Sequence, residues 1–172
     1  MLRVLHYAAL ACLAALAHAQ TTPAPKPPPE LRQLDYFAGK WRCEGVTKRS
    51  SVKWASPMQC GWFNGGLVLE CRSHANAPNE GEGVTIYGFN AVEKVYTQYS
   101  YGSTGADPSV LRGQRTGTTW TYTGEGTFQG KPAKYQYVVN EASASRFSYQ
   151  ARLVVEGGSW TVTQEGDCTK AK

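Results

Sequence analysis

Residues 146–155 read RFSYQARLVV, and polar and apolar side chains alternate through the first eight positions. Phe147, Tyr149, Ala151 and Leu153 occupy every second position, and the residues between them are polar or charged. Successive side chains of a β-strand point to opposite faces, so a period of two is typical of a strand with one buried face. The stretch therefore predicts an antiparallel sheet with aromatic side chains on its inner face.

The same alternation recurs along the chain, and no sustained 3.6-residue apolar period follows Gly39. Turn residues divide the chain into ten expected strands: 40–48, 53–63, 67–74, 83–89, 95–102, 109–114, 118–124, 133–140, 145–155 and 158–169. Residues 31–37 permit one or two helical turns. Closure removes the exposed edges of such a sheet, so we expect an all-β fold: a single antiparallel up-and-down β-barrel with a short N-terminal helix.

The N-terminus has the composition of a secretory signal. Arg3 precedes an apolar run, and Ala17-His18-Ala19 fits a small-x-small cleavage site, so residues 1–19 are predicted to be removed. Residues 20–30 are rich in proline and predict an extended tether, which leaves 31–172 as the domain. A buried N-terminal helix and a lipoprotein acylated at Cys12 are the alternatives. We expect an exported protein, either periplasmic or extracellular.

Composition narrows the class of protein further. The chain has 172 residues, 18% of them charged and 12% aromatic, which favours one folded domain over a disordered chain. No apolar run after the signal approaches the ~20 residues of a membrane-spanning helix, so we expect no integral membrane segment. The net charge of +5 is not clustered, and the aromatic residues are expected to face inward, so no nucleic-acid partner is predicted.

Four cysteines remain once the signal is removed, and an even number in an exported chain indicates two disulfides. A hairpin turn at Gly65-Gly66 would place Cys60 directly opposite Cys71. Cys43 and Cys168 lie on the first and last expected strands, and they can bond only where those strands meet, as in a closed barrel. This is one of the three connectivities that four cysteines allow.

The register of a Cys43–Cys168 bond would also place Trp41 opposite Lys170, where a cation beside an indole ring is favourable. Gly39-Lys40-Trp41 resembles the Gly-x-Trp entry of the calycin superfamily, which includes lipocalins and fatty-acid-binding proteins. In lipocalins this tryptophan packs under the barrel floor against a basic residue of the last strand. The resemblance assigns those roles to Trp41 and Lys170, with lysine in place of the more usual arginine.

A longer resemblance covers most of the chain after the tether. The segments LDYFAGKWRCEG (34–45), CGWFNGGLVLEC (60–71) and GGSWTVTQEGDCTK (157–170) are similar to an exported bacterial family known as domain of unknown function 1579. The resemblance implies a calycin-like barrel and transfers no activity. The first segment also resembles nitrobindin-like haem proteins, which bind haem through a histidine late in the chain. The only histidine after the signal is His74, in the third expected strand, so we expect no cofactor.

Catalytic and metal-binding patterns are missing from the sequence. One histidine and four paired cysteines do not supply the three or four clustered ligands that zinc needs, so no metal is predicted. Ser73 and His74 are neighbours in a strand and point to opposite faces, and no Gly-x-Ser-x-Gly motif is present. No catalytic residue is predicted, and a binding protein is favoured over an enzyme.

The aromatic interior is the remaining candidate site. Alternation directs eleven side chains inward: Trp41, Trp62, Ile86, Trp120, Tyr122, Tyr135, Tyr137, Phe147, Tyr149, Leu153 and Trp160. Seven of them are candidates for ligand binding: Trp62, Trp120, Tyr122, Tyr135, Tyr137, Phe147 and Tyr149. A barrel of this size is either filled by side chains or holds one small ligand.

Three functions fit that interior. The first is a lipocalin-like protein that binds a small apolar or aromatic molecule. The second is an enzyme that uses interior tyrosine or glutamate groups as acid or base, and the third is a structural or envelope-interaction protein with a filled barrel. The sequence does not specify the ligand or the oligomeric state.

Overall fold

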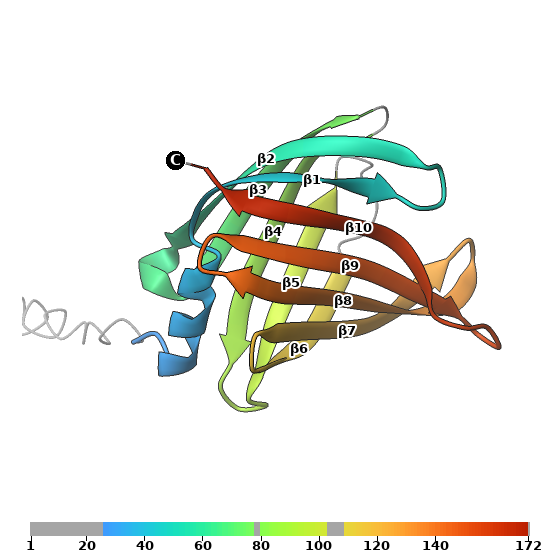
Figure 1. The fold of residues 1–172 in the computed structure, drawn as a ribbon. Coiled ribbons are helices and arrows are strands. Elements are labelled where there is room, and N and C mark those ends of the chain that lie inside the picture. The colour runs from blue at the N-terminus through green and yellow to red at the C-terminus, as the bar shows by residue number, and fades with distance from the viewer. Residues whose placement is uncertain (1–25, 78–79, 103–108, 172) are drawn as a thin grey trace, which may run out of the picture.

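A computed structural model describes residues 26–77, 80–102 and 109–171, and in it one sheet closes on itself (Figure 1). The strands are β1 (Gly39–Thr47), β2 (Val52–Phe63), β3 (Val68–Ala77), β4 (Glu80–Asn90), β5 (Val95–Gly102), β6 (Ser109–Thr116), β7 (Thr119–Phe128), β8 (Lys131–Ser143), β9 (Arg146–Val155) and β10 (Thr161–Lys170). Each strand pairs antiparallel with its neighbours in sequence, and β1 pairs with β10. The predicted all-β barrel of ten strands is confirmed.

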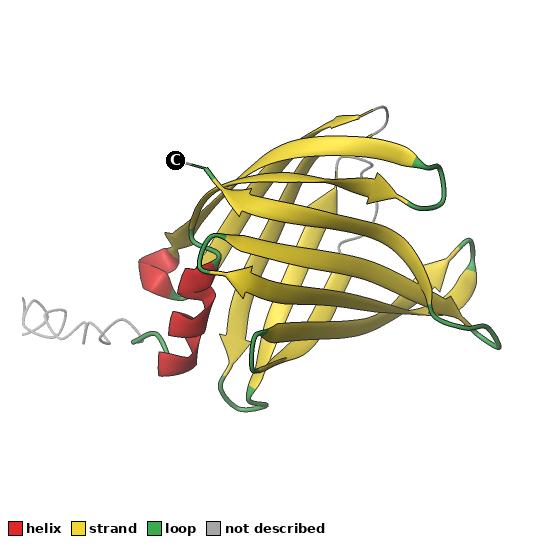
Figure 2. Cartoon of the chain, in the orientation of Figure 1, coloured by secondary structure: helices red, strands yellow, loops and turns green. Residues whose placement is uncertain are grey.

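The predicted short helix is a 3-10 helix, η1 (Pro29–Tyr36), which lies at one end of the barrel (Figure 2). Its first two residues, Pro29 and Glu30, belong to the predicted tether. Proline suits a first helical turn because the amide that it lacks would have no partner there. Leu31 and Leu34 of η1 are buried against the barrel. The predicted signal, 1–19, and residues 20–25 lie outside the described residues.

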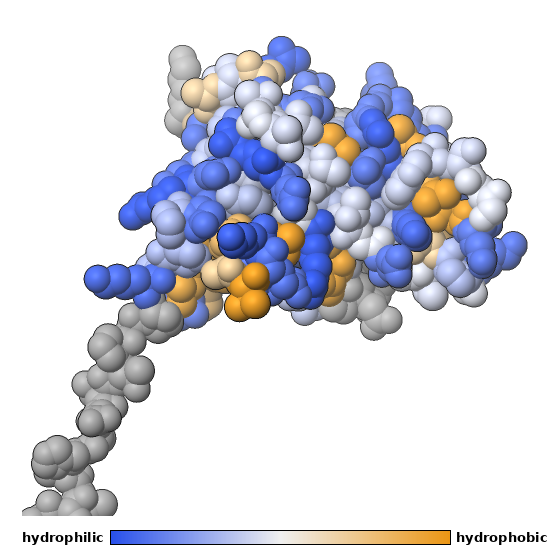
Figure 3. Space-filling view, turned by 90° about the horizontal axis from the view of Figure 1, so that it is seen from below, coloured by the Kyte–Doolittle hydropathy of each residue, from blue (hydrophilic) through white to orange (hydrophobic). Residues whose placement is uncertain are grey.

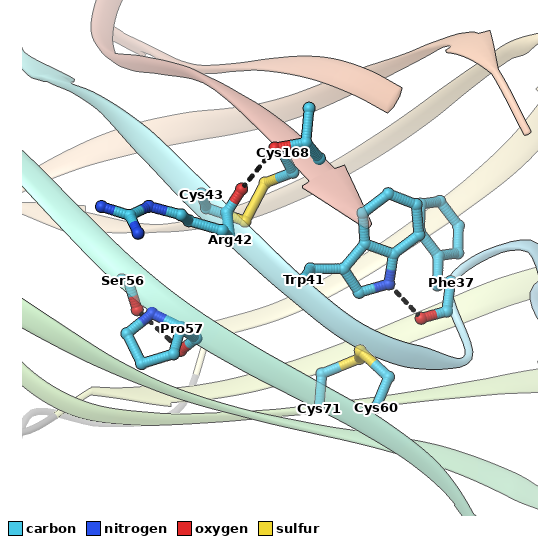
Figure 4. Close-up of a disulfide and its surroundings, with 10 residues drawn as sticks. Phe37, Trp41, Arg42, Cys43, Ser56, Pro57, Cys60, Cys71 and Cys168 are labelled. Carbon is cyan, nitrogen blue, oxygen red and sulfur yellow. Dashed lines mark hydrogen bonds between the residues drawn. A yellow bond between two sulfur atoms is a disulfide. The ribbon is translucent and has the colours of Figure 1, made fainter. Parts of the chain in front are cut away.

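Both cysteine pairs have the predicted partners. Cys43 is bonded to Cys168 across β1 and β10, and Cys60 to Cys71 across β2 and β3 (Figure 4). The connection between β2 and β3 is longer than the predicted two residues: it runs over 64–67 and contains a short 3-10 turn, η2 (Asn64–Gly66). Gly65 has a φ of 67°, which glycine adopts without a side-chain clash. The register is nevertheless the predicted one.

The inner face of the barrel follows the predicted alternation on most strands, with two corrections. Ile86 lies on the outer face, where it pairs with Tyr99, because the larger Tyr87 and Phe89 take the inward positions of β4. Trp160 precedes β10 and is 46% exposed, since the alternation does not extend into that turn. Trp54 also lies in the core, although it was not among the residues predicted to face inward.

On the face seen in Figure 3, hydrophobic residues form only small separate groups among hydrophilic ones. Within the described residues, no helix is both long enough and apolar enough to cross a membrane.

Candidate functional site

The interior of the barrel contains a cavity of ≈ 460 Å³. The cavity extends from Phe37, which follows η1 at the closed end, to a glycine-rich rim at residues 81–83 and Gly102. Side chains from β1–β5 and β8–β10 line it. A volume of this order is within the range of small-molecule sites in proteins.

The η1 end of the barrel is closed by hydrophobic packing. Phe37 stacks on Tyr87 at 5.9 Å between ring centroids and meets Phe147 edge-on at 5.5 Å. The Trp41 indole donates a hydrogen bond of 2.7 Å to the Phe37 carbonyl oxygen (Figure 4). Lys170 Nζ lies 5.1 Å from the centroid of the Trp41 ring, which is the contact that the strand register predicts. The two residues therefore fix the position of the closing segment.

Further hydrogen bonds hold η1 against the strands. The Trp62 indole donates to Asp35 Oδ1 at 2.8 Å, and the Tyr96 hydroxyl donates to the Glu30 carbonyl oxygen at 3.0 Å. The Tyr36 hydroxyl lies 2.8 Å from the carbonyl oxygens of Ser143 and Arg146. Trp62 was a candidate ligand-binding residue, but its indole nitrogen bonds Asp35 of η1 and the residue does not line the cavity.

A partly buried ion pair lies behind the closing segment. Glu141 accepts a hydrogen bond of 2.7 Å from the Trp120 indole and one of 2.9 Å from Arg115 Nη2. The Glu141 side chain is 9% exposed and that of Arg115 is 28% exposed. The Arg115 guanidinium also lies over the Trp120 ring, 5.3 Å from its centroid. Trp120 is completely buried and does not line the cavity.

One wall of the cavity is aromatic. Tyr137 of β8 and Tyr149 of β9 lie with ring centroids 5.2 Å apart, and Trp54 of β2 lies 6.2 Å from Tyr149. The Trp54 indole reaches across β1 and β10 because both strands have a glycine there. A Cβ atom at Gly45 would come within 2.5 Å of the indole, and one at Gly166 within 3.2 Å. The two glycines therefore make room for the ring.

The opposite wall is polar. Its hydroxyl and amide groups come from β3, β4 and β5, which lie across the barrel from β8–β10 in the strand order. Gln98 donates to the Ser100 hydroxyl at 3.2 Å, and the hydroxyls of Ser100 and Thr85 lie 3.1 Å apart. Ser73 also lines this wall. The Gln98 Oε1 atom is buried and has no hydrogen-bond partner among the described residues. The cavity is thus amphipathic: most of its neutral polar groups lie opposite the aromatic wall, although Ser56 of β2 and Gln164 of β10 also line it.

The cavity carries little charge. Among the described lining residues, Glu82 at the rim is the only one with a carboxylate, and none is a lysine, arginine or histidine. The described residues contain no group of three histidine, cysteine, aspartate or glutamate side chains that could hold a metal ion. His74 lies on β3 opposite Glu82 and does not line the cavity.

Several interior phenols are held in the protonated form. Burial raises the pKa of Tyr87, Tyr122 and Tyr137 far above the usual value, and neighbouring tyrosines add to the shift for Tyr122 and Tyr137. At the closed end, burial raises the pKa of Tyr36 to about 12, with a further contribution from the Glu141 charge. These groups are therefore hydrogen-bond donors and acceptors at neutral pH, and not bases.

These pKa shifts predict alkaline unfolding. Above pH ~10 the unfolded chain releases phenol protons that the folded barrel retains, so stability is complete below pH ~10 and falls as the pH rises. Above pH ~10, each of Tyr87, Tyr122 and Tyr137 should lower the free energy of unfolding by about 1.4 kcal/mol per pH unit. Urea unfolding at pH 8 to 12, followed together with tyrosinate absorbance, checks this. Interior phenols that titrate near pH 10 without loss of structure would contradict it.

The seven candidate ligand-binding residues do not form one group. Tyr137, Phe147 and Tyr149 line the cavity. Tyr122 and Trp120 are completely buried beneath its lining, and the Tyr135 hydroxyl donates to the Thr127 carbonyl oxygen at 2.6 Å.

Sequence reasoning missed the polar wall as well as Tyr87 and Trp54. The alternation of Tyr96, Gln98 and Ser100 on β5 could have revealed the polar wall. Trp54 has the same strand parity as Cys60, which could have placed it inside.

Comparisons with known proteins agree with the barrel and name no activity. Residues 26–170 match the family "Protein of unknown function (DUF1579)", and the chain belongs to that family. The crystal structure of Rv2717c from M. tuberculosis is similar in fold, with a TM-score of 0.58 and 13% sequence identity. The match covers 86% of this chain and 100% of that chain. No curated protein sequence matches the chain.

Proposed function

We propose that this member of the DUF1579 family binds one small, largely apolar molecule inside its barrel and acts as a lipocalin-like carrier. The observation that supports this most is the ≈ 460 Å³ cavity inside a barrel that is closed at one end. The network of aromatic rings and hydrogen bonds around η1 gives the cavity a fixed floor. A preformed cavity costs little reorganisation when a ligand enters.

The lining of the cavity favours an apolar or aromatic ligand. Trp54, Tyr137 and Tyr149 offer ring faces and edges to a flat molecule, and such aromatic contacts add to the gain from burial of apolar area. Phe37, Met58 and Val139 complete the apolar lining. The few polar groups on the opposite wall suit orientation and specificity of binding.

A carrier is favoured over an enzyme. The interior tyrosines have a raised pKa, so they are poorly suited to exchange protons at neutral pH. Glu82 lies at the exposed rim, and no second acidic or basic side chain among the described lining residues accompanies it. The described interior therefore lacks a matched acid and base.

Export is part of the proposal. The signal-like residues 1–19 support it, and so do the two disulfides, because such bonds persist in oxidising compartments and are rare in the cytosol. Edman sequencing or intact mass measurement of the protein from its natural host should give an N-terminus at Gln20. An intact Met1 would contradict export through this signal.

A cavity-filling substitution tests the binding site. We expect wild-type protein to bind 1-aminoanthracene, a neutral fused-ring fluorophore, with one site per chain. Ser100→Phe should lower the affinity by roughly tenfold or more, because its ring would occupy the space where the probe buries its apolar surface. Fluorescence titration of the oxidised mature protein measures both quantities.

Thr123→Phe is the matched control, since Thr123 is exposed on the outer face of β7 and the added ring leaves the cavity open. Its affinity should equal that of the wild type. Equal affinity of the wild type, Ser100→Phe and Thr123→Phe for the probe would show that it binds the outer surface. No binding by the wild type, of this probe or of a panel of lipids and aromatic compounds, would support the filled barrel instead.

A further inference from the structure

Three phenol hydroxyls inside the barrel, those of Tyr87, Tyr122 and Tyr137, have no hydrogen-bond partner among the described residues. The Tyr122 hydroxyl is buried and has no partner within the ranges that the structure describes. The hydroxyls of Tyr87 and Tyr137 form no hydrogen bond with the part of the chain that the structure describes. A desolvated polar group without a partner costs free energy, so these hydroxyls point to a partner that the described part of the chain does not supply.

Two of these hydroxyl-bearing rings face the cavity. Tyr87 and Tyr137 both line it and are only partly buried by accessible area, yet desolvation strongly raises the pKa of each phenol. Each ring therefore exposes its accessible surface to the internal cavity, where the phenol is shielded from bulk water. Tyr87 comes from β4 and Tyr137 from β8, on facing parts of the barrel. A molecule in the cavity therefore lies within reach of both.

The charge of the cavity restricts what that molecule can be. An anionic ligand would be buried without a counter-ion, because the described lining has no lysine, arginine or histidine. Among the described lining residues, a cationic ligand would have only the Glu82 carboxylate at the rim, at the other end of the cavity from Phe37. Protonated phenols donate hydrogen bonds to neutral oxygen acceptors, and a carbonyl oxygen accepts two of them through its two lone pairs.

We propose that the ligand is an uncharged carbonyl compound, such as a ketone or an ester, whose oxygen accepts hydrogen bonds from Tyr87 and Tyr137. This inference rests on the proposed function and specifies the class of ligand. The apolar part of the molecule packs against the aromatic wall of Trp54 and Tyr149. Gln98 and Ser100 on the opposite wall remain available to a polar substituent.

The test uses three naphthalene derivatives of similar shape: 2-acetylnaphthalene, which is a neutral ketone; 2-ethylnaphthalene, which lacks the acceptor; and 2-naphthoate, which is an anion. Their affinities are measured by displacement of 1-aminoanthracene from wild-type protein, Tyr137→Phe and Tyr87→Phe. Tyr135→Phe is the matched control, because it removes a hydroxyl from the same strand that is bonded outside the cavity, to the Thr127 carbonyl.

We expect Tyr137→Phe to lower the affinity for the ketone by roughly three- to tenfold, which is the range for loss of one neutral hydrogen bond. The same change should alter the affinity for 2-ethylnaphthalene by less than about twofold, since no hydrogen bond is lost. Tyr87→Phe should act in the same direction, and Tyr135→Phe should change neither affinity. In the wild type at pH 8, 2-naphthoate should bind more weakly than the ketone.

Two results would overturn the inference and leave the proposed function standing. In the first, 1-aminoanthracene still binds, but the ratio of the affinities for 2-acetylnaphthalene and 2-ethylnaphthalene is the same in Tyr87→Phe and in Tyr137→Phe as in the wild type. The other is tighter binding of 2-naphthoate than of the ketone. Failure of every probe to bind the wild type would instead defeat both proposals.

Discussion

Replacing Cys43 and Cys168 together by alanine should lower the free energy of unfolding by about 5 kcal/mol. The bond joins residues separated by 125 positions, and in the chain-entropy relation a loop of that length restricts the unfolded chain strongly. The bond also ties β1 to β10, where the barrel closes. Alanine is the suitable replacement because both cysteines are buried and a serine hydroxyl would need a partner.

The second disulfide is the control for this experiment. Cys60 and Cys71 are separated by only 11 positions and join neighbouring strands of one hairpin, so the same relation gives a cost of about 3 kcal/mol. Urea unfolding of both double variants at pH 7 measures the two costs. Equal costs, or a larger cost for the Cys60–Cys71 variant, would show that closure through β1 and β10 does not dominate stability.

Glu141→Leu should destabilise the protein by about 3 kcal/mol, the range for breaking a buried ion pair by removal of one partner. The change leaves the Trp120 indole and the Arg115 guanidinium without their common acceptor. Arg115 would be affected most, because its Nε atom is already buried without a hydrogen-bond partner in the described part of the chain. The closing segment should loosen as well, since Tyr36 contacts the carbonyl of Ser143 close by.

Asp167→Leu is the matched control for Glu141→Leu. Asp167 pairs with Arg146 at 3.3 Å on the outer surface, where both side chains are more than half exposed. Exposed ion pairs of this kind contribute about 0–1 kcal/mol to the free energy of unfolding, so Asp167→Leu should cost no more than that. Thermal unfolding followed by near-ultraviolet circular dichroism compares the two variants. A similar loss of stability in both would remove the distinction between the interior pair and the surface pair.

The barrel was predictable from sequence because its determinants are local. Alternation along residues 146–153 identifies the inner face of β9, and the spacing of Cys60 and Cys71 fixes one hairpin register. The predicted contact of Trp41 with Lys170 follows from the register of the first and last strands. Each of these depends on backbone periodicity, which a sequence displays directly.

The cavity was not predictable in the same way. In β4, apolar residues occupy both parities, and the alternation therefore placed Ile86 on the inner face where the structure has Tyr87. Whether the rings fill the interior depends on side-chain direction, as with the Trp54 indole that lies against Gly45 and Gly166. It also depends on Phe37, which enters from outside the sheet to close one end. These are contacts between distant segments, and alternation does not encode them.

A crystal structure of the oxidised mature protein grown with 1-aminoanthracene tests the central claim most directly. We expect density for one probe molecule inside the barrel, in contact with Tyr137 and Tyr149 and above Phe37. A probe seated on the outer surface, or interior side chains that meet across the barrel and leave no space, would contradict a hollow ligand-binding barrel.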